Sequence, residues 1–252
     1  MTRNETARSK TTRSETTRSE TTRSETTRNE TIRSETTRNE TTRSGITQRE
    51  HFLTTPVSDA NALAIHAGDI VYLSGIIYTA RDEAHLRMLE YDHEKKRLPF
   101  SLKGAVVFHC GPVMEKAGSG WRAVAAGPTT SDRMTKMTPD VLKNHDIKVL
   151  IGKGGMENLS SVMKERNCVY LSYTGGCAAL AVDMIKNVRA VYWEDLGMPE
   201  AVWELEVEKF GPLIAGIDAH GNDLFKDVLE KANAAFLDMK KHTKKTTDSK
   251  SE

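Results

Sequence analysis

The segment GPTTSDRM, residues 127–134, gathers three hydroxyl side chains and an arginine directly after an apolar run. Its glycine and proline predict a turn, so Thr129, Thr130, Ser131 and Arg133 would leave the end of a strand together. Hydroxyls, backbone N–H groups and a guanidinium make a receptor for a small anion. Ser, Thr and Asp are also the usual N-cap residues of helices. The segment alone leaves both interpretations open, an anion site and an ordinary helix cap.

Two further cations follow other predicted strands. Arg81 stands at the start of a predicted helix, where a positive side chain opposes the helix dipole. Lys153 follows IKVLIG and is flanked by glycines, which let the backbone and a ligand approach closely. The ordinary alternatives are a helix capped by Asp82 with Arg81 and His85 on the surface, and a solvated lysine in a mobile glycine turn. Taken together, three cations and a hydroxyl cluster without matching acids predict a substrate with more than one carboxylate.

Two other patterns are less informative. The glycines of Thr174–Gly175–Gly176, between a strand and an apolar helix, either hold an anion on backbone N–H groups or let the helix pack closely on the sheet, and packing is the preferred interpretation. Acids and a histidine follow the last predicted strands, but their spacing matches no metal-ligand template. We expect no metal site among them: Glu194, Asp195, Asp218, His220, Asn222 and Asp223.

The elements that must position these residues alternate along the chain. Strands are predicted at 69–80, 104–111, 121–127, 147–152, 168–173, 188–194 and 212–218, and helices at 82–96, 138–145, 156–167, 176–187, 199–210 and 222–241. This alternation predicts an α/β architecture with several parallel strands. The turn-rich PVMEKAGSG, between the second and third strands, indicates a hairpin-like excursion or a second sheet. Ligands of such folds bind outside the carboxyl ends of strands, where the candidate residues stand.

The N-terminal segment has a different character. A pentapeptide repeats through it, as in TTRSETTRSE, with almost no apolar residue. A period of five fits neither a helix nor a strand, so we expect residues 1–45 to be a disordered, charge-balanced tail, with transient helix as the alternative. The folded domain should span 46–240, followed by a flexible basic tail at 241–252.

Composition excludes several classes of protein. A formal net charge of +1 over 252 residues provides no basic field for nucleic acid. No apolar run approaches the roughly 20 residues that a membrane helix needs, and no signal peptide is recognisable, so we expect no membrane segment. Cys110, Cys168 and Cys177 are odd in number and irregularly spaced, which argues against a disulfide framework. A reducing, cytoplasmic location fits these features.

Six segments carry a resemblance to a known family: SGIIYTARDEAHLR, LPFSLKGAVVFHCGP, AAGPTTSDRM, IGKGG, YTGGCAAL and YWEDLGMPEAVWELEVEKFGPLIAGIDAHGND. In this order, between about Asp59 and Phe225, they resemble the β subunit, or C-terminal domain, of the iron–sulfur hydro-lyases, class I fumarate hydratase and L(+)-tartrate dehydratase. The resemblance implies a swivelling β/β/α domain and a chain that is half of an enzyme.

The resemblance also implies where the chemistry is divided. The [4Fe-4S] cluster is held by three cysteines of the α subunit, and its open iron binds the substrate. We expect no metal ligand in this chain, because Cys110 and Cys168 fall within or at the start of strands and none of the three cysteines lies in a ligand motif of the family. The expected partner is the α subunit, in an α2β2 complex that buries an apolar patch exposed on the lone chain.

By resemblance, Thr129 matches the proposed proton-transfer residue of the family, acting with an acid of the α subunit. Arg81, Arg133 and Lys153 match the residues that bind the substrate carboxylate remote from iron, and the hydroxyls of Thr130 and Ser131 are expected at the same site. A threonine hydroxyl is a poor base near neutral pH, so neighbouring cations must stabilise an alkoxide or a partner acid must relay the proton.

The leading hypothesis is the β subunit of a heteromeric hydro-lyase that reversibly hydrates fumarate to (S)-malate. The alternative substrate is L(+)-tartrate, dehydrated to oxaloacetate, since both are C4 dicarboxylates. A different class of function is a non-catalytic domain that binds a dicarboxylate or docks on another protein. A further class makes the N-terminal repeat an interaction tail and the functional part of the chain.

Overall fold

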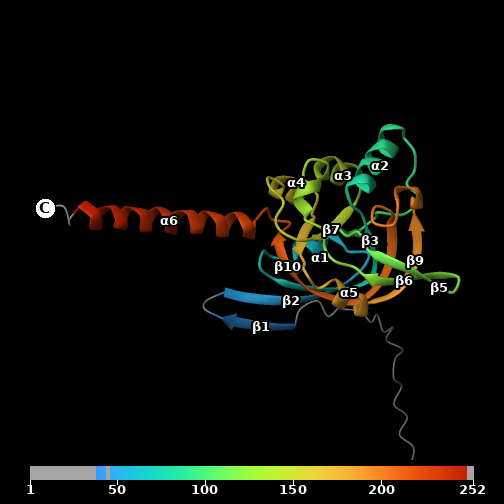
Figure 1. The fold of residues 1–252 in the computed structure, drawn as a ribbon, viewed down its shortest axis with the longest axis horizontal. Coiled ribbons are helices and arrows are strands. Elements are labelled where there is room, and N and C mark those ends of the chain that lie inside the picture. Colours follow the sequence, from blue (N-terminus) through green and yellow to red (C-terminus); the bar gives the residue numbers. More distant parts are fainter. Residues whose placement is uncertain (1–37, 44–45, 249–252) are drawn as a thin grey trace, which may run out of the picture. The chain divides into compact units, whose positions relative to one another are not determined.

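The structure, a computed structural model, describes residues 38–43 and 46–248 (Figure 1). Most of the tail expected to be disordered, residues 1–45, lies outside the described residues. Its segment Arg38–Arg43 corrects that expectation, because it forms strand β1, which pairs antiparallel with β2, Ile46–Thr54. Threonine is a good strand former, so this end of the repeat can extend once a neighbouring strand offers hydrogen bonds.

An eight-stranded sheet runs through the described residues in the order β1-β2-β3-β4-β7-β8-β10-β9. Strands β2, β3, β4, β7 and β8 are parallel, which confirms the predicted parallel arrangement. The long strand β10 pairs antiparallel with both β8 and β3, so β3, β4, β7, β8 and β10 close into a ring. The strands of this sheet not yet given bounds are Ile70–Thr79 for β3, Ala105–Phe108 for β4, Ile147–Gly152 for β7, Val169–Ser172 for β8, Ile185–Tyr192 for β9 and Val202–Ile217 for β10.

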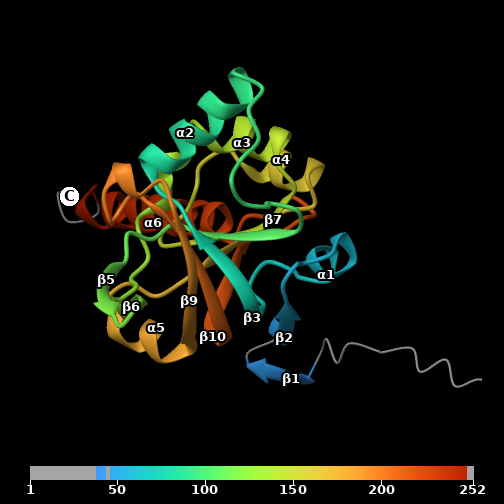
Figure 2. The same cartoon turned by 90° about the vertical axis from the view of Figure 1, so that its right-hand side faces the viewer.

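Helices cover the ring on its outer face. Helix α2 (Asp82–His93), α3 (Thr138–Asn144) and α4 (Ser160–Glu165) lie beside one another in both views (Figures 1 and 2). Apolar side chains of these helices form one core with outward-facing residues of the strands, such as Leu150 and Tyr170. The side chains that alternate with them along the strands, such as Val149 and Ile151, belong to a second core. The strands are therefore buried on both faces, as expected of a parallel sheet.

A hairpin stands apart from the main sheet. Strands β5 (Val113–Ala117) and β6 (Gly120–Ala125) pair only with each other, which confirms the excursion predicted from PVMEKAGSG. Met114 and Ala123 of the hairpin and Ala181 of α5 (Ala178–Met184) enter the second core. Three short helices lie in the connections between strands: α1 (Asp59–Leu63), and the 3-10 helices η1 (Ser131–Met134) and η2 (Glu194–Leu196).

The helix predicted at 199–210 is wrong, because this segment belongs to strand β10 from Val202 onward. Its glutamates favour a helix by propensity, yet Trp203, Leu205 and Val207 alternate with them at the period of a strand. Cross-strand partners on β9 hold two of the glutamates. Tyr192 Oη donates to Glu204 Oε2 at 2.9 Å, and Arg189 pairs with Glu206 at 2.7 Å. Pairing in the sheet therefore overrides helix propensity here.

The C-terminal helix α6 spans Leu224–Asp248. The flexible tail expected at 241–252 is therefore helical as far as Asp248, and residues 249–252 lie outside the described residues. None of the helices in the described segments has both the length and the apolar character needed to cross a membrane. The mixed α/β fold class is confirmed, whereas its assignment as a swivelling β/β/α domain stays a prediction.

Candidate functional site

The loops that carry the candidate residues meet at one end of the sheet. Strands β3, β4 and β7 are neighbours and parallel, so the segments after Thr79, Phe108 and Gly152 emerge side by side. Residues 129–131 lie between two of these segments. Thr129 N donates to His109 O at 2.7 Å, Lys153 N donates to Thr129 O at 3.2 Å, and Ser131 N donates to Lys153 O at 3.1 Å. Three loops that are distant in sequence are thus joined by backbone hydrogen bonds.

The hydroxyls of Thr129 and Thr130 lie on the outer side of this junction. Thr129 is half-buried and Thr130 is exposed. Thr130 precedes η1, but its side chain makes no capping hydrogen bond, so the ordinary capping interpretation does not account for it. Within the described part of the chain, neither hydroxyl has a hydrogen-bond partner. Both are therefore available to a ligand.

Ser131 lies on the inner side of the junction. Its side chain is fully buried, and its Oγ is 2.8 Å from His109 Nδ1 and 3.1 Å from Tyr170 Oη. Tyr170 Oη in turn donates to Gly154 O at 2.8 Å. The structure therefore places Ser131 behind the site, although it was expected to contact the substrate. The sequence pattern could not separate it from its two threonine neighbours.

Arg81 lies across the loop that follows β4. A Cβ at Gly111 would collide with its guanidinium and lie 3.0 Å from its Cδ, so only a glycine leaves room for this side chain. Arg81 Nη2 is 3.2 Å from Glu200 Oε1, while Glu200 Oε2 accepts a hydrogen bond from Glu83 N at 3.1 Å. Sequence reasoning missed Gly111 and Glu200. The signal for Gly111 was the Gly–Pro pair that ends GAVVFHCGP.

Arg133 also has an acidic partner. Its Nη2 is 2.7 Å from Asp82 Oδ2, and Asp82 is the first residue of α2. The expectation that the cations lack matching acids is therefore wrong for Arg81 and Arg133. Lys153 differs from both, since it is exposed and has no carboxylate partner among the described residues. An anionic ligand can bind Lys153 directly but must share or replace the carboxylates at the two arginines.

Two buried histidines lie directly beneath these cations. His85 Nδ1 is 2.8 Å from Arg81 O, and the rings of His85 and His109 meet edge to face at 5.3 Å. Burial lowers the pKa of His85. Burial, together with the charge that His85 would carry, holds the pKa of His109 well below its usual value. Both imidazoles are therefore neutral near pH 7, and the positive charge of the site comes from Arg81, Arg133 and Lys153.

The cysteines do not form a cluster-binding set. Cys110 follows β4 and Cys168 precedes β8, so they stand at opposite ends of two parallel strands that β7 separates. Burial raises the pKa of Cys110, and it raises that of Cys168 to about 12. Cys177, at the start of α5, donates to Thr174 O. Across the described residues no three His, Cys, Asp or Glu side chains gather as metal ligands.

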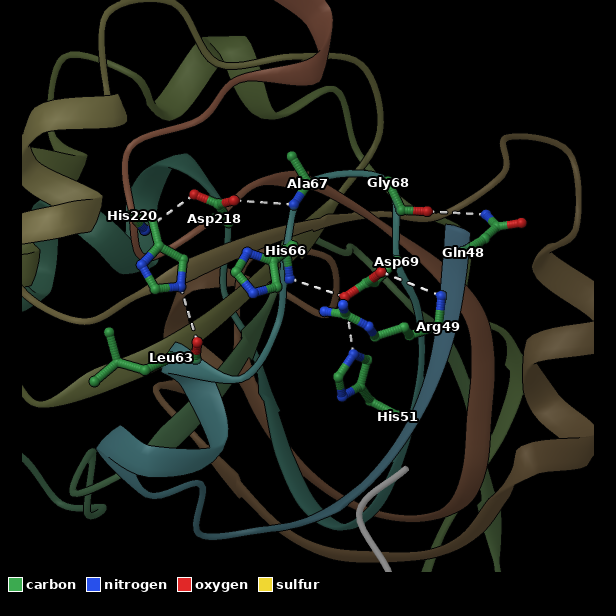
Figure 3. Close-up of polar contacts among 10 residues, drawn as sticks. All are labelled: Gln48, Arg49, His51, Leu63, His66, Ala67, Gly68, Asp69, Asp218 and His220. Atoms are coloured by element: carbon green, nitrogen blue, oxygen red, sulfur yellow. Dashed lines mark hydrogen bonds and ion pairs between the residues drawn. The ribbon is translucent and has the colours of Figure 1, made fainter. Parts of the chain in front are cut away.

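The acids and the histidine near the last strand have structural partners. Asp218 accepts hydrogen bonds from Ala67 N and His220 N (Figure 3). It also accepts one from the Asn222 side chain. Burial alone would raise the pKa of Asp218, but these hydrogen bonds lower it. Asp69 likewise accepts from His66 N and faces His51 at 2.9 Å. This cluster lies at the start of β3, opposite the end that carries Arg81, and it joins β3 to the end of β10.

Comparisons with known proteins place the chain among relatives. The family described as Fumarase C-terminus matches residues 19–228. A Methanocaldococcus jannaschii protein, provisionally named L(+)-tartrate dehydratase subunit beta, is 47% identical over 169 residues, which are 66% of this chain and 87% of the relative. The L(+)-tartrate dehydratase subunit beta of Escherichia coli K12 is 38% identical over 176 residues, 69% of this chain and 86% of the relative. A Geobacillus stearothermophilus protein provisionally named class I fumarate hydratase is 38% identical over 187 residues, 73% of this chain and 35% of the relative.

Proposed function

The chain belongs to the fumarase C-terminus family and is a hydro-lyase β subunit, and on this premise we propose that it supplies half of an active site for a C4 dicarboxylate. The proposed reaction is the reversible hydration of fumarate to (S)-malate. The observation that carries the proposal is the hydrogen-bonded junction that brings the Thr129 and Thr130 hydroxyls beside the Lys153 loop. Cations and free hydroxyls at the carboxyl ends of parallel strands suit a small anion.

One carboxylate of the substrate binds the cations of this chain. Lys153 offers a point charge, and Arg81 and Arg133 offer planar forks that match a carboxylate. The acids Glu200 and Asp82 orient the two guanidinium groups before the substrate arrives. Substrate binding then exchanges one carboxylate for another, so the arginines are never left uncompensated. Thr130 adds a hydroxyl to the same surface.

Thr129 is the proposed proton-transfer residue. Hydration adds a proton to one alkene carbon and a hydroxyl group to the other, so a group at the site must hold the proton in transit. The Thr129 hydroxyl lies at the outer face of the junction, next to Lys153 in the hydrogen-bonded ladder. A neighbouring cation stabilises the oxygen when it gives up its proton, and an acid of the partner subunit restores that proton.

The iron–sulfur cluster implied by the family does not fit the residues of this chain. Two of the three cysteines, Cys110 and Cys168, are buried with raised pKa values, and they stand at opposite ends of the parallel strands β4 and β8, which β7 separates. We therefore assign the cluster ligands to an α subunit and route no chemical step of this chain through the cluster. The proposed assembly is an α2β2 complex in the cytoplasm, active only when both chains are present.

L(+)-tartrate dehydration is the second candidate, with one observation in its favour. The two relatives named for tartrate dehydratase align over 86–87% of their own length, whereas the class I fumarate hydratase aligns over 35% of its own. The cations identified here suit either dicarboxylate. Tartrate has one more hydroxyl than malate, and Thr130 is an exposed donor that can bind it.

The test is substrate profiling of the assembled enzyme. The full chain would be co-expressed anaerobically with an α subunit of this family, the cluster reconstituted, and turnover of fumarate, (S)-malate and L(+)-tartrate compared for each chain alone and for the complex. Turnover that needs both chains supports the half-site, and the preferred substrate selects between the two candidates. A cluster-loaded complex that converts none of the three contradicts both and favours a non-catalytic, dicarboxylate-binding role.

A further inference from the structure

A buried chain of polar side chains connects the loops of the proposed site from below. His109 Nδ1 lies 2.8 Å from Ser131 Oγ, which lies 3.1 Å from Tyr170 Oη, which lies 2.8 Å from Gly154 O. The three side chains belong to residues that are fully buried. His109 follows β4, Ser131 opens η1, Tyr170 lies on β8 and Gly154 follows β7. One row of hydrogen bonds therefore reaches four segments of the fold.

The chemistry of the groups fixes the direction of every proton in this row. Gly154 O can only accept, so Tyr170 Oη–H donates to it. Having used its one proton, Tyr170 Oη must accept from Ser131 Oγ–H. The Ser131 oxygen then accepts from His109, which therefore carries its proton on Nδ1. His109 Nε2 is the unprotonated nitrogen, and it is buried without a hydrogen-bond partner in the described part of the chain.

Steric fit supports this arrangement. A Cβ at Gly152 would overlap Ser131 Oγ and lie 3.2 Å from His109 Nδ1, so the end of β7 leaves space for the row only because residue 152 is a glycine. The row also adjoins the loop that carries Arg81. The His85 ring contacts the His109 ring and its Nδ1–H donates to Arg81 O, since that carbonyl can only accept.

We propose that His109 and Tyr170 are positioning residues, which hold Ser131 in place and thereby fix the hydroxyls of Thr129 and Thr130 against the Lys153 loop. The inference rests on the proposed function, whose groups it places. His109 anchors the segment of residues 129–131 through Ser131, and Tyr170 anchors the lysine loop through Gly154 O. Neither side chain reaches the substrate, since both are fully buried. Their effect on the reaction passes through the geometry of the two loops.

Two substitutions at His109 separate hydrogen bonding from packing. Asparagine places an amide N–H close to the position of Nδ1, whereas leucine fills similar space without a donor. In the assembled α–β complex we expect His109→Leu to lower kcat/KM about ten- to a hundredfold, because Ser131 Oγ loses its donor in a buried site. His109→Asn should restore most of that loss. Equal kinetics for the wild type and both variants would overturn the proposal.

Tyrosine substitutions provide a second, independent pair. Tyr170→Phe removes the donor to Gly154 O and should raise KM and lower kcat together, because the Lys153 loop loses its anchor. Tyr192→Phe is the matched control, since Tyr192 also donates one hydrogen bond, to Glu204 on β10, away from the site loops. An unchanged kcat/KM in Tyr170→Phe, or equal losses in both variants, would contradict a positioning role.

The proton order can be measured without turnover. Long-range ¹H–¹⁵N spectra of the full chain distinguish protonated from unprotonated imidazole nitrogens, and the signals lost in His109→Asn identify His109. We expect a neutral ring with its proton on Nδ1, and a proton on Nε2 would overturn the proposed row. If the wild-type complex proves inactive, the proposed function fails by itself. The quantity to measure is then the affinity of the complex for malate in place of kcat/KM. Equal affinities for the wild type and His109→Leu would contradict the positioning role.

Discussion

At the scale of single residues, the arginines of the site are held by acids before any ligand binds. Arg81 pairs with Glu200 and rests on Gly111, and Arg133 pairs with Asp82. Sequence reasoning identified the arginines from their position after strands but predicted no acidic partners. Glu200 lies more than a hundred residues after Arg81, so its contact depends on how the segment before β10 folds back, which no local pattern encodes.

The planar fork of Arg81 is expected to be necessary for substrate binding. In Arg81→Lys one ammonium must serve both Glu200 and the substrate carboxylate, so we expect KM of the assembled enzyme to rise about tenfold with a smaller change in kcat. Arg87→Lys is the matched control, because Arg87 lies on α2, the helix that begins directly after Arg81, and pairs with Asp195. Steady-state kinetics of both variants check this, and a KM that rises equally in both would refute a specific role for Arg81.

The buried histidines predict a pH dependence of stability. Their folded-state pKa values are lowered, so below about pH 6.5 the unfolded chain binds protons that the folded chain does not. The free energy of unfolding should therefore fall as pH drops below that value, by about 1.4 kcal/mol per pH unit for each histidine that stays neutral. Denaturant titrations between pH 7.5 and 5 measure this slope. It should be shallower in His109→Asn, and an identical slope would show that His109 is protonated in the folded chain.

At the scale of elements, the end of β7 is adapted to the segment packed on it. Gly152 has an ordinary backbone angle, but a Cβ there would overlap Ser131 Oγ, whereas Gly154 has φ +73° and open space around it. Gly152→Ala should therefore destabilise by about 1–3 kcal/mol through overpacking and also lower turnover. Gly154→Ala should cost about 1 kcal/mol through backbone strain alone. The test is to measure the free energy of unfolding and kcat/KM for both variants. A Gly152→Ala enzyme with unchanged turnover would contradict the prediction.

Local patterns predicted most elements because their periodicity was strong. The strands at Ile70–Thr79 and Ile147–Gly152 and the helix at Asp82–His93 follow the apolar pattern of the sequence. The segment 199–210 was misassigned because glutamates that suit a helix are paired across β9 and β10. At the site, sequence reasoning located the loops, but it could not assign Ser131 to the interior. That assignment depends on His109, which follows β4, and on Tyr170 of β8, both of which contact Ser131 from elsewhere in the chain.

At the scale of the whole molecule, this chain supplies cations and hydroxyls, while its described residues contain no grouped metal ligands. Under the proposed function a partner completes the site, and exposed apolar side chains near the site loops suit such a contact. Val113 and Val124 of the hairpin and Leu180 of α5 are about half exposed or more. The hairpin and α5 flank the site, since Cys110 bridges to Pro128 and Gly127 packs on Ala178.

Docking of the α subunit over this face is expected to be sensitive to charge. Leu180→Asp should weaken co-assembly at least tenfold while leaving the melting temperature of the lone chain nearly unchanged, because Leu180 is 65% exposed there. Leu63→Asp is the control, on α1 near the opposite end of β3. Titration of the two chains by light scattering measures both. Equal affinity of the wild type and Leu180→Asp for the α subunit would show that the interface lies elsewhere.

The most direct test of the account is the turnover of Thr129 variants in the assembled enzyme. Thr129→Ala removes the hydroxyl proposed to transfer the proton, and Thr129→Ser retains it on a smaller side chain. We predict that kcat falls at least a hundredfold in Thr129→Ala and stays within about tenfold of the wild type in Thr129→Ser, with similar KM and cluster content in all three. A Thr129→Ala enzyme that turns over like the wild type would contradict the assignment of proton transfer to this chain.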